Sequence, residues 1–220
     1  MVKIERIVDK YFFGLLVPIL YMFSFLDKKN KPKKILVIKL WAIGDSVLSL
    51  VLIKALKKLG KVDVLTRKRV VDVFKSYDVN KIYDMDDTKS FLKLISKGKQ
   101  YDLVFDCEPY LNISAIFSFL LGKQRIGFSD QWRSMLYNEK IKFMKDQHMV
   151  QNYLDMARSV GIRYDTEKLE KLKISKKAKT KIDTFLKKIK KPLIGITPGV
   201  AETVKTRMWF EDRFAELSDR

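Results

Sequence analysis

The sequence has very few of the residues that build disulfide scaffolds and metal clusters. Among its 220 residues there is one cysteine, Cys107, and one histidine, His148. One cysteine excludes a disulfide framework and a cysteine-based zinc site, and one histidine excludes a multi-histidine metal centre. General disorder is excluded as well, because hydrophobic residues make up 47% of the chain and can form a packed core.

Acidic residues are scarce relative to basic ones. Lys and Arg number 45 against 26 Asp and Glu, which gives a formal net charge of +19. The excess is spread along the chain, with 22 basic and 13 acidic side chains in residues 1–110 and 23 and 13 in residues 111–220. It predicts an anionic partner, namely nucleic acid, a membrane surface or a phosphorylated small molecule.

No apolar run is long enough for a standard membrane span. The longest uncharged run is Tyr11–Leu26, sixteen residues interrupted by Pro18, whereas a spanning helix needs about 20. A signal peptide usually ends in small residues at its cleavage site, and the large residues near the end of this run do not fit that pattern. Since lysines follow the run, we favour residues 1–34 as an interfacial segment on an anionic membrane surface, at the cytoplasmic face. A helix packed on the domain itself is the alternative.

From Ile35 onward the pattern alternates between short β-rich runs and helical periodicity. Such alternation predicts βαβ units and a doubly wound, mostly parallel sheet in an α/β fold. The predicted strands are Ile35–Leu40, Val62–Thr66, Lys81–Tyr83, Tyr101–Asp106, Gln124–Phe128 and Leu193–Thr197. The predicted helices begin near Asp45, Val70, Thr88, Leu111, Gln147 and Phe210.

The segment Lys171–Lys191 holds ten lysines in 21 residues and invites a nucleic-acid interpretation. Its apolar residues nevertheless fall on one helical face. The lysines are therefore interpreted as the solvated side of an amphipathic helix. No RNP, zinc-finger or helix-turn-helix pattern supports a nucleic-acid binder, so no nucleic-acid partner is expected.

The segment Lys39–Asp45, at the end of the first predicted strand and in the loop after it, is the strongest candidate site. Ligands of open parallel sheets bind beyond the carboxyl ends of the strands. Gly44 would let a ligand approach the backbone, and Asp45 would be an ionised carboxylate able to act as a general base. A role for Asp45 as helix N-cap alone is the alternative. The Gly-x-Gly-x-x-Gly pattern of dinucleotide sites is absent.

A second candidate follows the strand at Leu193–Thr197. The turn Thr197–Gly199, with the basic residues Lys205 and Arg207 after it, suits a diphosphate. A routine strand-to-helix turn is equally consistent with the pattern.

The third candidate is the end of the strand Tyr101–Asp106. Glu108 and Tyr110 could line an acceptor site or belong to a polar loop. Cys107 is expected to be a small core or edge residue. His148 at a helix start suits either an acceptor contact or a structural hydrogen bond.

Taken together, these segments resemble glycosyltransferase family 9, the ADP-heptose:lipopolysaccharide heptosyltransferases. The similarity covers about Ile35 to Arg220 and rests on segments that occur in the family's order. They are ILVIKLWAIGDSVLSLVLIKALKK, VDVLT, YDLVFDCEPY, RIGF, HMVQNYLDMARSVGI, IGITPG and RMWFEDRFAEL.

The resemblance implies a GT-B fold with the active site between two Rossmann-like domains. The first domain would bind a lipid-linked saccharide acceptor and the second a nucleotide-sugar donor. Transfer would be inverting and would need neither a metal nor another cofactor. Asp45 matches the family's general base, Arg207 its phosphate-contacting basic residue, and Thr197–Gly199 its donor-side loop.

Two features depart from the family pattern. Phe210 replaces the proline that usually follows the tryptophan at 209. The chain is also shorter than members of this family commonly are. We expect three parts: a membrane-associating segment 1–34, an acceptor-side domain 35–173, and residues 174–220 as the beginning of the donor domain. A non-catalytic acceptor-binding or scaffold protein derived from such an enzyme is the alternative function.

Overall fold

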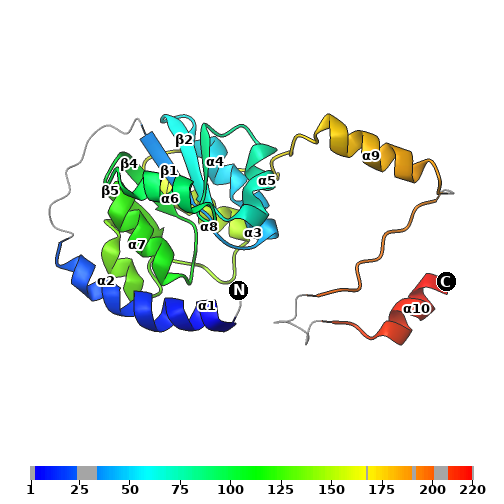
Figure 1. The fold of residues 1–220 in the computed structure, drawn as a ribbon, viewed down its shortest axis with the longest axis horizontal. Helices are drawn as coiled ribbons and strands as arrows, with labels where there is room; N and C mark the ends of the chain where they lie inside the picture. The colour runs from blue at the N-terminus through cyan, green and yellow to red at the C-terminus, as the bar shows by residue number, and fades with distance from the viewer. Residues whose placement is uncertain (1–2, 24–33, 167, 190–191, 201–207, 220) are drawn as a thin grey trace. The chain divides into compact units, whose positions relative to one another are not determined.

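The computed structural model describes residues 3–23, 34–166, 168–189, 192–200 and 208–219 (Figure 1). They divide into two compact units, residues 1–173 and 174–220, and each is considered by itself. The first unit is an α/β fold around one sheet. The second contains α9 (Lys176–Leu186) and α10 (Glu211–Asp219).

The sheet of the first unit has six strands, all parallel, in the order β3-β2-β1-β4-β5-β6. The strands are β1 (Lys34–Ile38), β2 (Lys61–Thr66), β3 (Lys81–Asp84), β4 (Tyr101–Asp106), β5 (Gly122–Phe128) and β6 (Glu139–Ile141). The order reverses between β1 and β4, which confirms the predicted doubly wound α/β fold. β1 is buried along four of its five residues because helices cover both faces.

Helices pack on both faces of the sheet (Figure 1). They are α3 (Ile43–Leu48), α4 (Leu50–Leu56), the 3₁₀ turn η3 (Lys68–Val70), α5 (Val71–Lys75), α6 (Thr88–Ile95), α7 (Asn112–Leu121), the 3₁₀ helix η4 (Trp132–Leu136) and α8 (Met149–Ser159). One core joins α4, α5 and α8 to the sheet. The core on the other face joins α6 and α7 to it.

Some expected boundaries were wrong. The connection before α8 contains η4 and the short strand β6, neither of which was predicted. Asp87, rather than Thr88, caps α6, because its carboxylate accepts from the amides of Lys89 and Ser90. Leu193–Thr197 is not a strand, since a strand needs a paired neighbour and the described part of the second unit contains no other strand.

The N-terminal segment forms one continuous helical stretch made of α1 (Lys3–Val8), the π-helical turn η1 (Asp9–Phe13) and α2 (Gly14–Tyr21). Figure 1 shows this stretch passing alongside α7. Its inner face joins a third core with α7 and η4, where Val17 is fully buried. A Cβ on Gly14 would lie 3.4 Å from the Trp132 ring, an ordinary van der Waals distance, so the helix lies close to η4 at this point.

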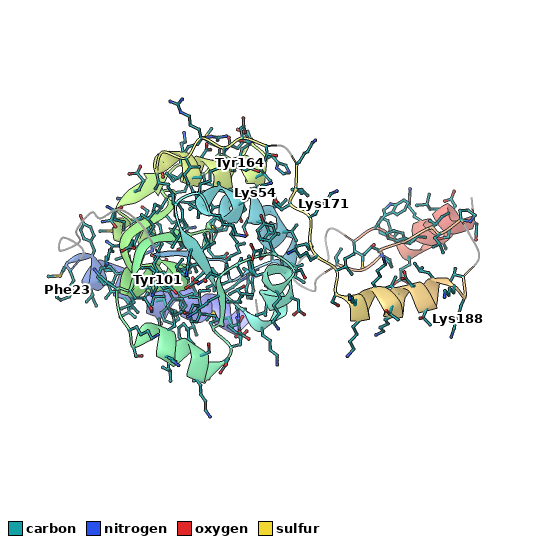
Figure 2. All side chains as sticks on the ribbon, turned by 90° about the horizontal axis from the view of Figure 1, so that it is seen from above. Phe23, Lys54, Tyr101, Tyr164, Lys171 and Lys188 are labelled. Atoms are coloured by element: carbon teal, nitrogen blue, oxygen red, sulfur yellow. The ribbon has the colours of Figure 1, made fainter. Side chains whose placement is uncertain are left out.

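The outer face of the same stretch is apolar and exposed. Its large side chains are 42–75% exposed, and they are Ile7, Val8, Tyr11, Phe12, Leu15, Ile19, Met22 and Phe23. Figure 2 shows Phe23 projecting at the periphery of the first unit. The inner face therefore packs on the domain, as the alternative hypothesis expected, while membrane binding by the outer face stays a prediction. Within the described residues, none of the helices combines the length and apolar character of a membrane span.

Candidate active site

An open cavity of about 740 Å³ lies beyond the carboxyl ends of β1 and β4, where the strand order reverses. This is the position at which open parallel sheets bind ligands. Its walls come from the loops after β1 and β4, from the N-terminal helix and from the loop into η4. The lining residues are Arg6, Asp9, Lys10, Trp41, Asp45, Glu108, Pro109, Tyr110, Leu111, Asn112, Gln131 and Trp132.

Asp45 presents its carboxylate to this cavity from the first turn of α3. The side chain is exposed, and among the described residues no hydrogen bond or ion pair joins it to another group. It is not the N-cap of α3, because that position belongs to Ala42. The prediction of an N-cap role was therefore wrong.

The backbone of this loop is held in an uncommon conformation at Ala42, whose φ is 63°. A residue with a side chain adopts positive φ at a cost of about 1–3 kcal/mol unless its surroundings impose it. The Ala42 carbonyl accepts from both the amide (3.1 Å) and the hydroxyl (2.8 Å) of Ser46. Gly44 has negative φ and open space around it, so Ala42 is the conformationally demanding position.

The buried Glu108 side chain binds the loop that follows β1. Its carboxylate accepts from the Lys39 ammonium at 2.9 Å and from the amides of Leu40 and Trp41 at 2.7 and 2.8 Å. Both charged side chains are almost fully buried. Burial raises the pKa of Glu108, and the Lys39 charge opposes this rise. Glu108 thus lines the cavity, but its carboxylate oxygen is engaged in joining two loops.

A second buried network fixes the β4 loop around Asp106. One of its oxygens accepts from the Ser114 hydroxyl at 2.7 Å, the Tyr137 hydroxyl at 2.6 Å and the Arg133 guanidinium at 3.1 Å. Arg133 is completely buried and also donates to the backbone carbonyls of Leu111 and Glu108. Burial disfavours the Arg133 charge, but Tyr137 and Asp106 outweigh it and raise the Arg133 pKa.

The N-terminal helix is joined to the site through Asp9. Its carboxylate accepts from the backbone amides of Asn112 (3.0 Å) and Ile113 (2.9 Å) at the start of α7. The residue before α7, Leu111, offers no side-chain cap of its own. Asp9 therefore supplies the N-cap interaction from another helix, about one hundred residues away in sequence.

Comparisons with known proteins agree with this architecture. Residues 92–220, more than half of the chain, match the model of glycosyltransferase family 9 (heptosyltransferase). The chain belongs to glycosyltransferase family 9. No curated protein matches at a significant level.

Solved structures support the family 9 fold. A glycosyl transferase family 9 structure from Veillonella parvula has a TM-score of 0.67 at 16% identity, over 88% of this chain and 61% of that one. ADP-heptose lps heptosyltransferase II of E. coli gives 0.64 at 24%, over 84% and 60%. E. coli heptosyltransferase WaaC, solved with ADP, gives 0.52 at 19%, over 62% and 50%. The chain thus spans about half to three-fifths of these relatives.

The cavity brings together Asp45, the predicted general base, with Glu108 and Tyr110, two of the predicted acceptor-side residues. Gly44 and His148 are not among its lining residues. His148 caps α8, with its Nδ1 accepting from the Val150 amide at 3.3 Å, so it has the structural hydrogen bond considered for it. Cys107 is a buried core residue, and burial raises the pKa of its thiol well above the ordinary value.

The donor-side residues of the family pattern fall in the second unit. Thr197 and Gly199 are exposed and lie in a segment without regular secondary structure. Lys205 and Arg207 lie outside the described residues. The donor site therefore stays a prediction from the sequence.

Sequence reasoning missed several residues that shape the cavity. Trp41 lies against the Arg69 guanidinium at 3.5 Å from its ring centroid, and Trp132 adds a further aromatic wall beside the predicted Tyr110. Arg6 and Lys10 bring positive charge from the N-terminal helix. For Trp41, the available signal was its place in the loop after β1. Residues 6, 10 and 132 reach the site through tertiary packing, so no local sequence pattern indicates them.

Proposed function

We propose that this chain acts as a glycosyltransferase. It moves a heptose-like sugar from a nucleotide-diphosphate sugar to a lipid-linked saccharide, with inversion and without a metal, in cell-envelope glycan biosynthesis. The observation that carries the proposal is the Asp45 carboxylate, which has no partner among the described residues and lies in an aromatic-walled cavity at the switch point of the sheet. Membership of family 9 supports the reaction class.

Asp45 is the general base of this reaction. It takes the proton from the acceptor hydroxyl while the hydroxyl oxygen attacks the anomeric carbon of the donor sugar. The bond between that carbon and the diphosphate oxygen breaks, and its electron pair leaves with the nucleotide diphosphate. Attack from the face opposite to the leaving group inverts the anomeric centre.

The departing diphosphate is received by the second unit. Arg207 and Lys205, with the turn Thr197–Gly199, offset its negative charge, a contribution that is often the largest in such steps. ADP is the proposed nucleotide, because the similar E. coli heptosyltransferase WaaC has been solved with ADP and with ADP-2-deoxy-2-fluoro heptose.

The acceptor side is equipped for an anionic saccharide. Trp41, Tyr110 and Trp132 give aromatic faces on which sugar rings can stack, and Arg6 and Lys10 are exposed cations at the same cavity. A phosphorylated or carboxylated sugar unit would place its charge near these two residues. Gly44 and His148 are retained only as peripheral candidates.

We propose further that the protein works at the cytoplasmic face of the membrane as a peripheral protein. The apolar outer face of the N-terminal helix supports this, as do the five lysines that the sequence places between Lys28 and Lys34. An apolar helix face with flanking positive charge is the pattern of interfacial membrane binding. This arrangement would bring a lipid-linked acceptor to the cavity.

The test of the proposed function is Asp45→Asn. Because the carboxylate has no partner in the described structure, we expect the variant to keep its circular dichroism spectrum and melting temperature. Transfer of labelled sugar from ADP-sugars to extracted lipids should fall by about a hundredfold or more, as for a lost general base. The assay uses membranes from cells that express the protein.

Asp72→Asn is the matched control. Asp72 is also an exposed aspartate in the first turn of a short helix, α5, and it does not line the cavity. This variant should transfer at the wild-type rate. Wild-type turnover by Asp45→Asn would contradict the proposed role, and complete absence of transfer by the wild-type protein would favour the non-catalytic alternative.

A further inference from the structure

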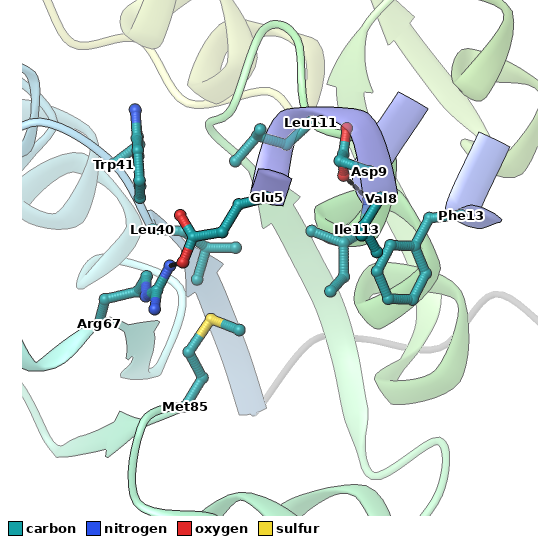
Figure 3. Close-up of a pocket in the computed structure, with 10 residues that line it drawn as sticks. All are labelled: Glu5, Val8, Asp9, Phe13, Leu40, Trp41, Arg67, Met85, Leu111 and Ile113. Atoms are coloured by element: carbon teal, nitrogen blue, oxygen red, sulfur yellow. Dashed lines mark hydrogen bonds and ion pairs between the residues drawn. The ribbon is translucent and has the colours of Figure 1, made fainter. Parts of the chain in front are cut away.

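A second, smaller cavity lies beneath the N-terminal helix, also beyond the carboxyl edge of the sheet. Its volume is about 280 Å³, far above the roughly 10–15 Å³ that one water needs. Six apolar side chains contribute most of its wall, and they are Val8, Phe13, Leu40, Met85, Leu111 and Ile113. Figure 3 shows Met85 on the β3 side and Ile113 on the α7 side, with the N-terminal helix passing over them.

The charged groups at this cavity are paired with one another. Arg67 donates to Glu5 of α1 at 3.2 Å and binds Asp86 at 2.8 Å. The hydrogen bond that Arg67 donates to Asp86 raises the Arg67 pKa, so the guanidinium stays charged and engaged. The Asp9 carboxylate is occupied by the two amides of α7. The charged groups of this wall are therefore already engaged, and most of the remaining wall is apolar.

The two cavities are neighbours. Asp9, Trp41 and Leu111 line both of them, and Asp45 belongs to the larger one. A single amphipathic molecule can consequently lie with its polar part in the aromatic cavity near Asp45 and its apolar part under the N-terminal helix. A free sugar would leave the apolar cavity without a partner.

We infer that the smaller cavity binds the hydrocarbon of the acceptor lipid, at the end that joins the saccharide. This inference rests on the proposed function and assigns a site to the lipid part of the substrate. The hydrocarbon is favoured over a protein side chain because the apolar cavity shares Trp41 and Leu111 with the saccharide cavity. The exposed apolar face of the same helix would let the rest of the chain remain in the membrane.

The test measures binding of alkyl β-glucosides that share one head group and differ in chain length. Methyl, butyl, hexyl and octyl glucosides are titrated into the full chain by calorimetry, below their micelle concentrations. Each methylene that enters the cavity should tighten binding about fourfold. Affinity independent of chain length in the wild-type protein would overturn the inference.

Met85→Trp fills the cavity and should remove the dependence on chain length while leaving methyl glucoside binding unchanged. Met144→Trp is the matched control, since Met144 is a partly exposed methionine that lines neither cavity. Ile113→Trp fills the cavity from the opposite wall and replaces Met85→Trp if that variant does not fold. Equal chain-length dependence in the filled and control variants would overturn the inference.

Photolabelling locates the chain directly. An octyl glucoside with a terminal diazirine should label the peptides that carry Met85 and Ile113. Labelling confined to the outer face at Leu15 and Ile19 would overturn the assignment. Sugar transfer without chain-length-dependent binding would refute this inference alone, whereas such binding without transfer would refute the proposed function and leave the cavity assignment standing.

Discussion

At the residue scale, the carboxylates around the cavity have distinct tasks. Asp9 caps α7, Asp106 gathers a hydroxyl, a phenol and a guanidinium, and Glu108 binds a buried lysine and two amides. All three are buried and engaged by neighbouring donors. Asp45 is the remaining acidic residue of the cavity wall, and its exposed carboxylate has no such partner among the described residues. The three buried carboxylates therefore hold the loops in place, and the Asp45 carboxylate is left available for proton transfer.

The Lys39–Glu108 pair makes a prediction about stability and pH. Removing the lysine as Lys39→Met leaves a buried carboxylate without its counter-ion, which should cost about 3–5 kcal/mol near neutral pH. Burial raises the pKa of Glu108 in the folded state, and loss of Lys39 removes a group that opposes this rise. The native state then binds the proton more readily than the unfolded state, whose pKa is about 4.3.

The sign follows from proton linkage. A raised folded-state pKa means that the unfolding free energy is highest below the unfolded pKa and falls as pH rises through the folded value. The deficit of Lys39→Met should consequently shrink as pH is lowered from about 7 to about 4. Urea denaturation across this range measures it, with Lys61→Met as a control for the loss of one exposed lysine. A deficit that is constant with pH would contradict the prediction.

At the scale of secondary-structure elements, the position of the N-terminal helix depends on one residue at its middle. Asp9 binds the amino end of α7, and the adjoining α2 packs its inner face on α7 and η4. The same helix covers the apolar cavity and contributes Arg6 and Lys10 to the larger one. Loss of the contact between Asp9 and α7 should therefore loosen the walls of both cavities.

Asp9→Ala tests this contact. Loss of an N-cap carboxylate costs about 0.5–2 kcal/mol, and here it also removes the link between two helices. We expect a lower melting temperature and faster amide hydrogen exchange throughout residues 3–21. Asp87→Ala, which removes the cap of α6, should lower stability by a similar amount without changing exchange in residues 3–21. Equal exchange of this segment in both variants would refute the role of Asp9.

Helices and strands that are stabilised by residues near in sequence can be predicted, whereas contacts between residues far apart in sequence cannot. β4 is predicted at its observed bounds, because a run of buried β-favouring residues is a local signal. β6 has three residues and is largely exposed, so it lacks that signal. The cap that Asp9 gives to α7 joins residues about one hundred positions apart, and no local pattern encodes it.

The candidate site was predictable to a similar extent. The β1 loop and Asp45 follow from the rule that ligands bind at the carboxyl ends of parallel strands and from the family resemblance. Arg133 and Trp132 lie between the predicted strand Gln124–Phe128 and the predicted helix near Gln147, where the sequence predicts no helix or strand. Their contributions arise only when η4 packs against the β4 loop.

At the scale of the whole molecule, the net charge of +19 and the apolar outer face of the N-terminal helix are the two features that support the proposed membrane binding. The apolar face would insert among lipid chains, and the basic side chains would attract anionic headgroups. The electrostatic part should weaken with salt, because ions screen charges beyond about 8–10 Å at physiological strength. The apolar part should persist.

A double substitution on the outer face separates these contributions. Leu15→Glu with Ile19→Glu places two charges at positions that are 71% and 54% exposed, so the fold should be retained. Sedimentation with vesicles that contain anionic lipid should fall at least tenfold, since burial of each large apolar side chain contributes about 1.5–3 kcal/mol. Leu92→Glu with Met144→Glu carries the same charge change on exposed apolar residues elsewhere and should bind nearly as the wild type does. If both double variants sedimented alike, the apolar face would not be the membrane contact, and the lysines would account for any binding that remains sensitive to salt.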